Sequence, residues 1–327
     1  MSGAVAAVLP TDRLTVGIQL PIQSQSTIYA EPWEADAGAD ELAAVARAAD
    51  EAGLGYVAVC DHVAVPTDKA ETMSAAWWDT IATLGWLAGI TERVRLLSHV
   101  YVPAYRHPLA VAKAWSTLDR VSGGRAVMGV GAGHVEGEFA ALGVPFAERG
   151  ALLDEAIDAV RACFADEVPT HDGDRWRFSG LAQRPRPVQD AGPPVWVGGS
   201  SRPAIRRAAR RGDGWLPQGP LSPEVVDTLR AEMVAAGREG EGFDLGALAG
   251  PVYVGEADWD VGPGIVGPPG KVAHVLSKLA GLGAVQVQVR PRSRSVAELV
   301  DQIGRLGSEV LPHLAEVRPR PLFDGGS

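Results

Sequence analysis

The chain has little of what marks several protein classes. Its 327 residues include only two cysteines, Cys60 and Cys163, which cannot make a disulfide framework or a zinc site by themselves. The formal net charge is −10 and no run of Lys and Arg interrupts it, which disfavours nonspecific nucleic-acid binding. No apolar run is long enough to span a membrane, and the N-terminus lacks the basic start of a signal peptide. We therefore expect a cytoplasmic protein with no nucleic-acid or membrane partner.

Several catalytic and cofactor motifs are also absent. The sequence has no His/Cys spacing typical of zinc sites, no Walker phosphate loop and no GxSxG nucleophile elbow. The glycines of Gly129-Val-Gly-Ala-Gly133 have GxGxG spacing, which is not the Rossmann fingerprint. We therefore predict no metal site, and a glycine-rich end of a barrel strand explains this segment as well as a dinucleotide site would.

Strand and helix patterns alternate along almost the whole chain. Apolar residues make up 46% and charged residues 21%, the balance of a globular protein with a substantial core. Short apolar runs predict strands at 14–20, 56–60, 94–99, 126–130, 195–197, 214–217, 251–254 and 284–289. Helical spacing and cap residues predict helices at 41–52, 77–90, 108–121, 151–164, 203–211, 223–236, 270–282 and 296–311.

Eight strand–helix units favour a closed (β/α)8 barrel, the TIM-barrel fold of the α/β class, over an open sheet. The strands are continuously apolar, as expected for parallel strands buried on both faces. We expect one barrel domain at 14–315, a flexible tail at 1–13, a second tail at 316–327 and an inserted hairpin at about 168–194. Because barrel insertions usually lie at the C-terminal strand ends, we expect residues 21–36, 63–74 and 168–194 to wall a pocket.

Three histidines follow predicted strands at the barrel end where active sites lie. Asp61-His62 comes directly after the second strand, and a His beside a carboxylate suits proton transfer near neutral pH. A His that caps a loop is the alternative. His99 ends the third strand, where it could be catalytic or could satisfy hydrogen bonds in the barrel core. His134 follows the glycines of the fourth strand and could instead be a lone surface histidine.

The turn Gly198-Gly-Ser-Ser201 follows the fifth strand and opens a helix. Glycines let a backbone approach an anion closely, and the free amides at a helix N-terminus together with Ser hydroxyls bind phosphate. Arg202 could add positive charge. An ordinary tight turn between a strand and a helix is the alternative.

Several stretches together resemble the bacterial luciferase-like family. They are Gly17-Ile-Gln-Leu-Pro21, Val59-Cys-Asp-His62, Arg95-Leu-Leu-Ser-His-Val-Tyr-Val-Pro-Ala-Tyr-Arg-His-Pro108, Leu118-Asp-Arg-Val-Ser-Gly-Gly-Arg125, Gly129-Val-Gly-Ala-Gly133, Pro185-Arg-Pro-Val-Gln189, Pro194-Val-Trp-Val-Gly-Gly-Ser200, Arg210-Arg-Gly-Asp-Gly-Trp215 and Gly267-Pro-Pro-Gly-Lys-Val272. The similarity spans roughly residues 14–314, and the block around the fifth strand is quite specific.

The resemblance implies a barrel that holds a flavin, or its 5-deaza analogue, across the C-terminal ends of the strands. The cofactor phosphate would bind the turn at Gly198, Gly199 and Ser200. Members of the deazaflavin branch carry a non-proline cis peptide after strand three, and the matching bond here is His99–Val100. The residues implied to contact the cofactor are Ser98, His99, Val100, Gly131, Gly133, Gly198, Gly199, Ser200 and Ser201.

The resemblance also bears on which cofactor is used. Asp61-His62 resembles the Asp-His of enzymes that use the deazaflavin coenzyme F420 more than the Glu-His-His often seen in flavin monooxygenases. The F420-dependent sugar-phosphate dehydrogenases have a Trp shortly after Asp-His and an acid after the strand-four glycines. This chain has Val63-Ala-Val-Pro66 and His134 at those places, which argues against a sugar-phosphate substrate.

We therefore expect a coenzyme F420-dependent oxidoreductase that moves a hydride between the deazaflavin and a small organic substrate. His62, held by Asp61, would move the accompanying proton or anchor the substrate, and His99 and His134 would line the pocket. The alternatives are a reduced-FMN monooxygenase and a cofactor-binding protein without turnover. Relatives often dimerise through outer helices, and the apolar segment 77–90 would suit a homodimer, with a monomer as the alternative.

Overall fold

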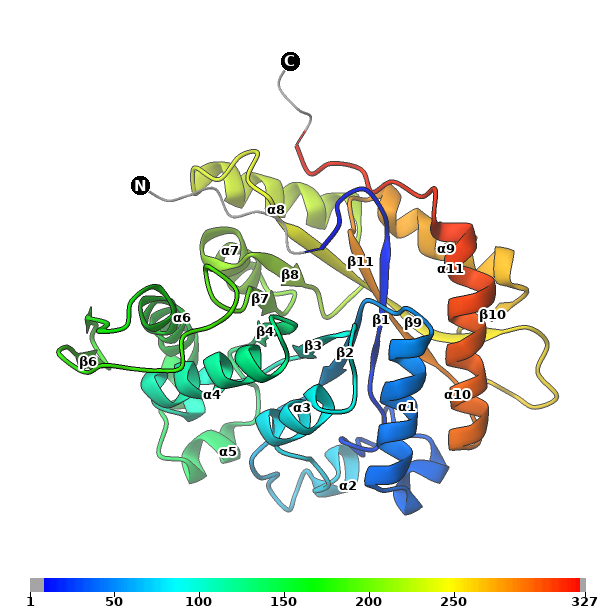
Figure 1. The fold of residues 1–327 in the computed structure, drawn as a ribbon, viewed down its shortest axis with the longest axis horizontal. Helices are drawn as coiled ribbons and strands as arrows, with labels where there is room; N and C mark the ends of the chain where they lie inside the picture. The colour runs from blue at the N-terminus through cyan, green and yellow to red at the C-terminus, as the bar shows by residue number, and fades with distance from the viewer. Residues whose placement is uncertain (1–8, 324–327) are drawn as a thin grey trace.

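Eight parallel strands close into a barrel with helices around the outside (Figure 1). The structure is a computed structural model that describes residues 9–323. Strand pairing runs β1–β2–β3–β4–β7–β8–β9–β11 and returns to β1, and every pair is parallel. The first and last long helices, α1 and α10, pack side by side, which brings the two ends of the strand–helix series together (Figure 1). The predicted (β/α)8 barrel is confirmed.

The element bounds follow the predicted units closely. The barrel strands are β1 (Thr15–Gln19), β2 (Tyr56–Val59), β3 (Arg95–Ser98), β4 (Ala126–Val130), β7 (Val195–Gly198), β8 (Gly214–Leu216), β9 (Asp244–Val254) and β11 (Gln286–Pro291). The outer helices are α1 (Ala39–Glu51), α3 (Thr80–Ala88), α4 (Pro108–Val121), α6 (Arg149–Ala165), α7 (Arg202–Arg211), α8 (Pro223–Ala235), α9 (Pro269–Gly281) and α10 (Val296–Arg305). The shorter elements are α2 (Ala70–Met73), α5 (Glu136–Ala141), α11 (Leu311–Leu314), β5 (His171–Asp172), β6 (Arg177–Phe178), β10 (Ile265–Gly267), the 3-10 helices η1 (Pro32–Asp36), η2 (Pro103–Tyr105) and η3 (Phe146–Glu148), and the π-helix η4 (Leu306–Val310).

Side-chain caps decide where several helices begin. Ser201 caps α7 by accepting a hydrogen bond from the amide of Ala204. Asp79 accepts a hydrogen bond of 2.8 Å from the amide of Ala82, so α3 starts at Thr80. The predicted start at residue 77 was therefore wrong, because hydrophobic spacing does not show where the first amides find a cap.

Buried side chains pack in the lower part of the barrel interior. Tyr56, Trp196 and Leu9 belong to one buried cluster with residues of neighbouring strands. The Tyr56 hydroxyl donates to the side-chain oxygen of Gln286, and the Trp196 indole donates to Asp244 at 3.1 Å. Aromatic rings with satisfied polar ends thus occupy the lower barrel, which leaves open space at the C-terminal strand ends.

The two predicted tails lie partly outside the described residues. Residues 1–8 and 324–327 are not described, and within the described part Leu9 is buried under the barrel. Near the other end, the amide of Arg320 donates to the carbonyl of Ala280, which attaches this segment to α9. No helix within residues 9–323 is both long and apolar enough to cross a membrane.

The inserted hairpin does not contribute to the pocket. β5 and β6 pair in an antiparallel manner between α6 and β7, and the hairpin lies at the outer side of α6 (Figure 1). Glu155 of α6 holds it by accepting hydrogen bonds from the amides of Arg175 and Trp176. None of the described residues lining the main cavity comes from 168–194. The expectation that this segment walls the pocket was wrong, because it connects a helix to the next strand rather than a strand to the next helix.

Strand β9 is longer than predicted. It begins at Asp244 rather than at residue 251, although Gly246, Gly250 and Pro251 give its sequence the look of a loop. A side chain at Gly246 would come within 2.0 Å of the Gln286 amide nitrogen, so this glycine is needed for close packing. The pairing of β9 with β11 shifts register between Gln288 and the next residue, which places an irregularity beside Gly250.

The buried carboxylate of Asp119 gives a test of the fold. It accepts hydrogen bonds from the amides of Val188 and Gln189 at 2.7 and 3.0 Å, and from the Gln189 side chain at 2.7 Å. We expect Asp119→Ala to lower the free energy of unfolding by about 2–4 kcal/mol, since these buried donors would lose their acceptor. Urea unfolding measures the change, with the exposed neighbour Arg120→Ala as a control within about 0.5 kcal/mol of wild type. Equal stability of Asp119→Ala and wild type would contradict this account.

Candidate active site

A cavity of about 970 Å³ opens at the C-terminal ends of the barrel strands, and all eight strands or the segments that follow them contribute to it. Ligand cavities commonly measure about 300–1,000 Å³, so the space suits a cofactor together with a small substrate. The predicted site residues that line it are Asp61, His62, His99, Val100, Gly131, Gly133, His134, Gly198, Gly199 and Ser201. Ser98 and Ser200 do not line it; the Ser98 hydroxyl donates to the carbonyl of Gly129 at 2.7 Å.

The connections after β1 and β2 line one side of the cavity and bind each other. The Thr27 hydroxyl donates to the carbonyl of Thr72 at 2.7 Å, and the amide of Gln25 donates to the carbonyl of Ala76 at 3.1 Å. Many residues between 21 and 34 contribute to the wall, whereas the second connection contributes mainly around His62 and at its later end. The two predicted loops therefore form one linked wall.

His99 is fixed between two glutamine side chains. Its Nδ1 lies 2.9 Å from the side-chain oxygen of Gln288, and its Nε2 lies 2.7 Å from the side-chain nitrogen of Gln218. Since an amide oxygen only accepts and an amide nitrogen only donates, these contacts assign the proton to Nδ1. Burial lowers the pKa of His99 to about 4. His99 is therefore a neutral, oriented group at neutral pH rather than a proton donor.

The His99–Val100 peptide bond is cis, as the resemblance implied. The Val100 side chain lies between two glycines on neighbouring strands. A Cβ at Gly131 would come within 2.4 Å of one Val100 methyl group, and a Cβ at Gly198 within 2.5 Å of the other. These two glycines therefore leave space for Val100, which presents an apolar surface to the cavity.

Asp61 does not hold His62. Its two carboxylate oxygens accept hydrogen bonds from the Arg106 guanidinium at 2.7 and 2.9 Å, and one of them also accepts the amide of Val102 at 2.9 Å. The carboxylate is buried, so this bidentate pair is a strong link between the ends of β2 and β3. The predicted Asp61–His62 contact was wrong, because adjacent residues after a strand point to different sides.

His62 is held instead by Glu138, a residue that sequence reasoning missed. Glu138 lies on α5 and is buried, and one of its oxygens is 2.9 Å from the Nδ1 of His62. The same carboxylate accepts the Tyr105 hydroxyl at 2.8 Å and the amides of Val63 and Ala64 at 2.5 and 3.1 Å. Burial alone would raise the pKa of Glu138, but these four donors outweigh it and hold its pKa below the usual value. Glu138 is therefore ionised and accepts a hydrogen bond from the Nδ1–H of His62.

Two aromatic rings flank His62 at the cavity wall. The Trp77 ring centroid lies 4.4 Å from that of His62, and the His134 centroid lies 5.7 Å from it on an edge-to-face geometry. His134 is exposed at the rim, yet partial desolvation and the neighbouring His62 lower its pKa. His134 is thus a surface residue that also belongs to the His62 cluster.

The turn Gly198–Ser201 lines the cavity on the side opposite the His62 cluster in strand order. Its serine hydroxyls accept hydrogen bonds from nearby backbone amides. Ser201 caps α7, and the Ser200 hydroxyl accepts the amide of Gln218 at 2.8 Å. Gly199 has a φ of +108°, a conformation that favours glycine, and this turn contributes backbone rather than hydroxyl groups to the cavity.

Two arginines of the neighbouring helices add positive charge to the same cavity. Arg207 lines it from α7 and is anchored by Asp154 at 2.7 Å and the carbonyl of Gly150 at 2.9 Å. Arg149 lines it from the start of α6 and stacks on the ring of Phe146 at 4.0 Å. Sequence reasoning does not find Arg207, because the middle of an outer helix usually faces solvent. Together with the amides of the turn, these cations suit an anionic group.

A family model described as luciferase-like monooxygenase matches residues 14–261 of this chain. The chain belongs to this family. An uncharacterised protein of Mycobacterium tuberculosis is 31% identical over 212 residues, which are 61% of this chain and 75% of that protein. An F420-dependent hydroxymycolic acid dehydrogenase of the same organism is 32% identical over 208 residues, 63% of this chain and 55% of the relative.

The fold of the family is also seen in solved structures. A riboflavin lyase whose structure holds a modified FMN and riboflavin superposes with a TM-score of 0.77 at 17% identity, over 96% of this chain and 94% of the other. At this identity the likeness concerns the fold. As a member of the luciferase-like family, the protein is an oxidoreductase of the TIM-barrel type.

The Glu138 carboxylate predicts a specific pH dependence of stability. Its pKa is lower in the folded protein than its ordinary value of 4.5, so its contribution is full above that pH and is lost as pH falls through the folded pKa. We expect Glu138→Gln to be destabilised relative to wild type at pH 7, and the gap to shrink as pH falls from 5 to 3, since Gln does not titrate. Urea unfolding across this range measures it.

The exposed Glu136 on the same helix provides the matched control: Glu136→Gln should leave the free energy of unfolding at pH 7 within about 0.5 kcal/mol of wild type. A gap between wild type and Glu138→Gln that stays constant from pH 7 to 3 would contradict the ionised assignment.

Proposed function

We propose that the protein is a coenzyme F420-dependent oxidoreductase that transfers a hydride to or from a small organic substrate. The observation that carries the proposal is the His62–Glu138 pair at the wall of a cavity in which His99 is held neutral. The F420-dependent relative at 32% identity supports the choice of cofactor. Such a cofactor accepts or releases a hydride and reacts poorly with oxygen.

The residues present fit a cofactor of this kind. Val100 offers an apolar surface within the cavity, and apolar surface suits the face of a planar ring. The amides around Gly199 and the cations Arg149 and Arg207 would hold its phosphate, since amides at a helix N-terminus and arginines bind phosphate. Ser98 and Ser200 contribute to this binding only through the backbone geometry they stabilise.

His62 is the residue that would move the proton. Because the Nδ1–H of His62 donates a hydrogen bond to Glu138, Nε2 is the ring position that can exchange a proton with substrate. In the oxidation of an alcohol, the substrate C–H bond would give up a hydride while its O–H proton passes to Nε2. In the reverse direction, reduction of a carbonyl, its carbon would receive the hydride and its oxygen would receive the proton from Nε2. Asp61 is a positioning residue, since it binds Arg106 and Val102 rather than substrate.

A reduced-FMN monooxygenase is the second candidate, because the family model is named for monooxygenases. The same cavity would then hold FMN, with the same turn around its phosphate. The two candidates differ in their need for oxygen, so oxygen uptake with reduced FMN separates them. Neither candidate needs a metal or a protein partner.

Titration of the purified protein with oxidised F420, and separately with FMN, tests the proposal. We expect micromolar or tighter binding of F420 and much weaker binding of FMN. Quenching of cofactor fluorescence measures the binding of each. Tighter binding of FMN, accompanied by oxygen uptake when it is reduced, would overturn the F420 assignment in favour of the monooxygenase.

The phosphate turn can be tested through Gly199. We expect Gly199→Ala to weaken cofactor binding at least tenfold, because Ala is strained at a φ of +108° and would shift the backbone amides. Gly53→Ala is the matched control: Gly53 also has a positive φ of +75° but does not line the cavity. Both variants should lose about 1–2 kcal/mol of stability, and only Gly199→Ala should lose affinity. Equal cofactor affinity in the two variants would refute the turn assignment.

A further inference from the structure

Strand β11 presents polar side chains to the barrel interior at every second position. Gln286 accepts the Tyr56 hydroxyl, Gln288 accepts the Nδ1 proton of His99, and Arg290 lines the cavity. The intervening residues Val287 and Val289 belong to the apolar core cluster. Because a strand alternates its side chains between two faces, the three polar residues form a ladder from the lower barrel to the mouth.

The guanidinium of Arg290 lacks the partners that the lower residues of this ladder have. Among the described residues it has no hydrogen bond or ion pair, and its one ring contact is with Tyr29, at 5.3 Å from the ring centroid. Its side chain is half-buried, and burial lowers its pKa. The nearby carboxylates Glu34 and Glu31 oppose this effect through their charge, but neither makes an ion pair or hydrogen bond with Arg290. An arginine carries five N–H donors, and partly desolvated donors without acceptors are unfavourable.

The other arginines of the cavity each have a partner in the protein. Arg207 is bound to Asp154, Arg149 donates to the carbonyl of Phe146 at 2.9 Å, and Arg292 is paired with Glu31. Within the described part of the chain, Arg290 is thus the one cavity arginine with no hydrogen bond or ion pair to the protein.

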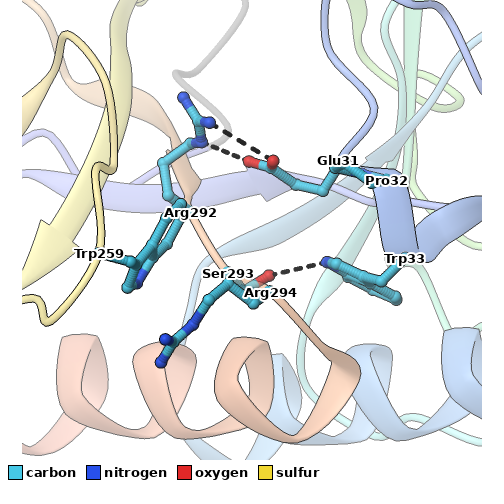
Figure 2. Close-up of a pocket in the computed structure, with 7 residues that line it drawn as sticks. All are labelled: Glu31, Pro32, Trp33, Trp259, Arg292, Ser293 and Arg294. Carbon is cyan, nitrogen blue, oxygen red and sulfur yellow. Dashed lines mark hydrogen bonds and ion pairs between the residues drawn. The ribbon is translucent and has the colours of Figure 1, made fainter.

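The acidic residues near Arg290 are already engaged. Figure 2 shows Arg292 directed toward Glu31, beside a smaller cavity of about 480 Å³ where the Trp33 indole donates to Ser293 at 3.2 Å. The Glu34 carboxylate accepts the amides of Ile22 and Glu31, both at 2.8 Å. Neither carboxylate forms a hydrogen bond with Arg290, so its donors remain available to a ligand in the cavity.

Arg290 is also separate from the turn expected to hold the cofactor phosphate. In the closed barrel, β8 and β9 lie between β7, which leads into that turn, and β11. On its other side β11 pairs with β1, and the connection after β1 supplies Tyr29 to the same wall. Ile28 and Tyr29 are 71% and 60% exposed, so a ligand at Arg290 would find uncovered apolar surface beside it.

We propose that Arg290 binds an anionic group, a carboxylate or a phosphate, of the substrate, and that the enzyme therefore acts on anionic small molecules. This inference rests on the proposed function, in which a substrate shares the cavity with the cofactor. The planar guanidinium matches the two oxygens of a carboxylate or phosphate, and Tyr29 and Ile28 would cover the apolar part next to it.

The test measures the binding of simple anions to the intact protein by calorimetry, with benzoate as the carboxylate probe and inorganic phosphate as the phosphate probe. Both are titrated with and without saturating F420. We expect at least one probe to bind wild type, and Arg290→Met to weaken that binding roughly tenfold to hundredfold. Arg290→Lys should fall between the two, because it keeps the charge and loses the planar fork. The probe that binds identifies the anion.

Two control variants assign the effect to this position. Arg294→Met removes a nearby arginine that pairs with Glu298 and does not line the main cavity, so it should bind the probes as wild type does. Phosphate binding that is lost in Gly199→Ala and kept in Arg290→Met belongs to the turn and counts against the proposal. Circular dichroism and urea unfolding check that each variant is folded.

Three outcomes would overturn the proposal: no binding of either probe to wild type at millimolar concentration, equal binding in wild type and Arg290→Met, or weaker F420 binding in Arg290→Met with probe binding unchanged. The last outcome would make Arg290 a cofactor contact. Failure of the proposed function is seen separately, as weak binding of F420 to wild type while Arg290-dependent binding of the anion persists.

Discussion

The geometry of the site depends on one buried carboxylate, that of Glu138. It collects the His62 ring, the Tyr105 hydroxyl and two backbone amides, and so joins the connection after β2, the turn after β3 and the short helix α5. An unpaired buried carboxylate costs several kcal/mol, whereas four donors offset most of that cost. The same contacts that keep the carboxylate ionised therefore also fix the orientation of His62.

The histidines of the cavity lie in different surroundings. His99 is deeply buried and held between Gln218 and Gln288, and its pKa of about 4 keeps it neutral. His62 and His134 lie at the wall, closer to solvent and to an ionised carboxylate. Residues of the same type thus have different surroundings, because His99 is buried between two neutral amides, which favours its neutral form, whereas His62 has a carboxylate against its Nδ1.

The fold could be predicted almost completely from the sequence, since parallel strands buried on both faces are short apolar runs and each helix has its own spacing. The failures have local causes. Most of β9 was not predicted, because its glycines and Pro251 are typical of a loop. Gly246 is needed there for close packing against Gln286, a tertiary contact that the local sequence does not show. The hairpin near 171–178 was assigned to the wrong side of the barrel, since turn signals do not show which end of the barrel a loop joins.

The site could be predicted only in part. Strand ends brought Asp61, His62, His99 and the turn at Gly198 to one cavity, as barrel topology requires. The partner of His62 could not be predicted, because α5 is a helix of 6 residues and is too short to show a hydrophobic period. Proximity in sequence suggested Asp61 as the partner of His62, whereas the actual partner, Glu138, lies 76 residues away in the sequence.

One sequence signal for the cavity was present and easily overlooked. In a fully buried parallel strand both faces are expected to be apolar, yet Gln286, Gln288 and Arg290 alternate with valines along β11. Alternation of this kind cannot indicate a solvent face inside a closed barrel, so the polar residues must face the interior. The two lower ones have protein partners there, at Tyr56 and His99. The uppermost, Arg290, has no hydrogen bond or ion pair among the described residues and lines the open cavity, where we propose that a substrate anion binds it.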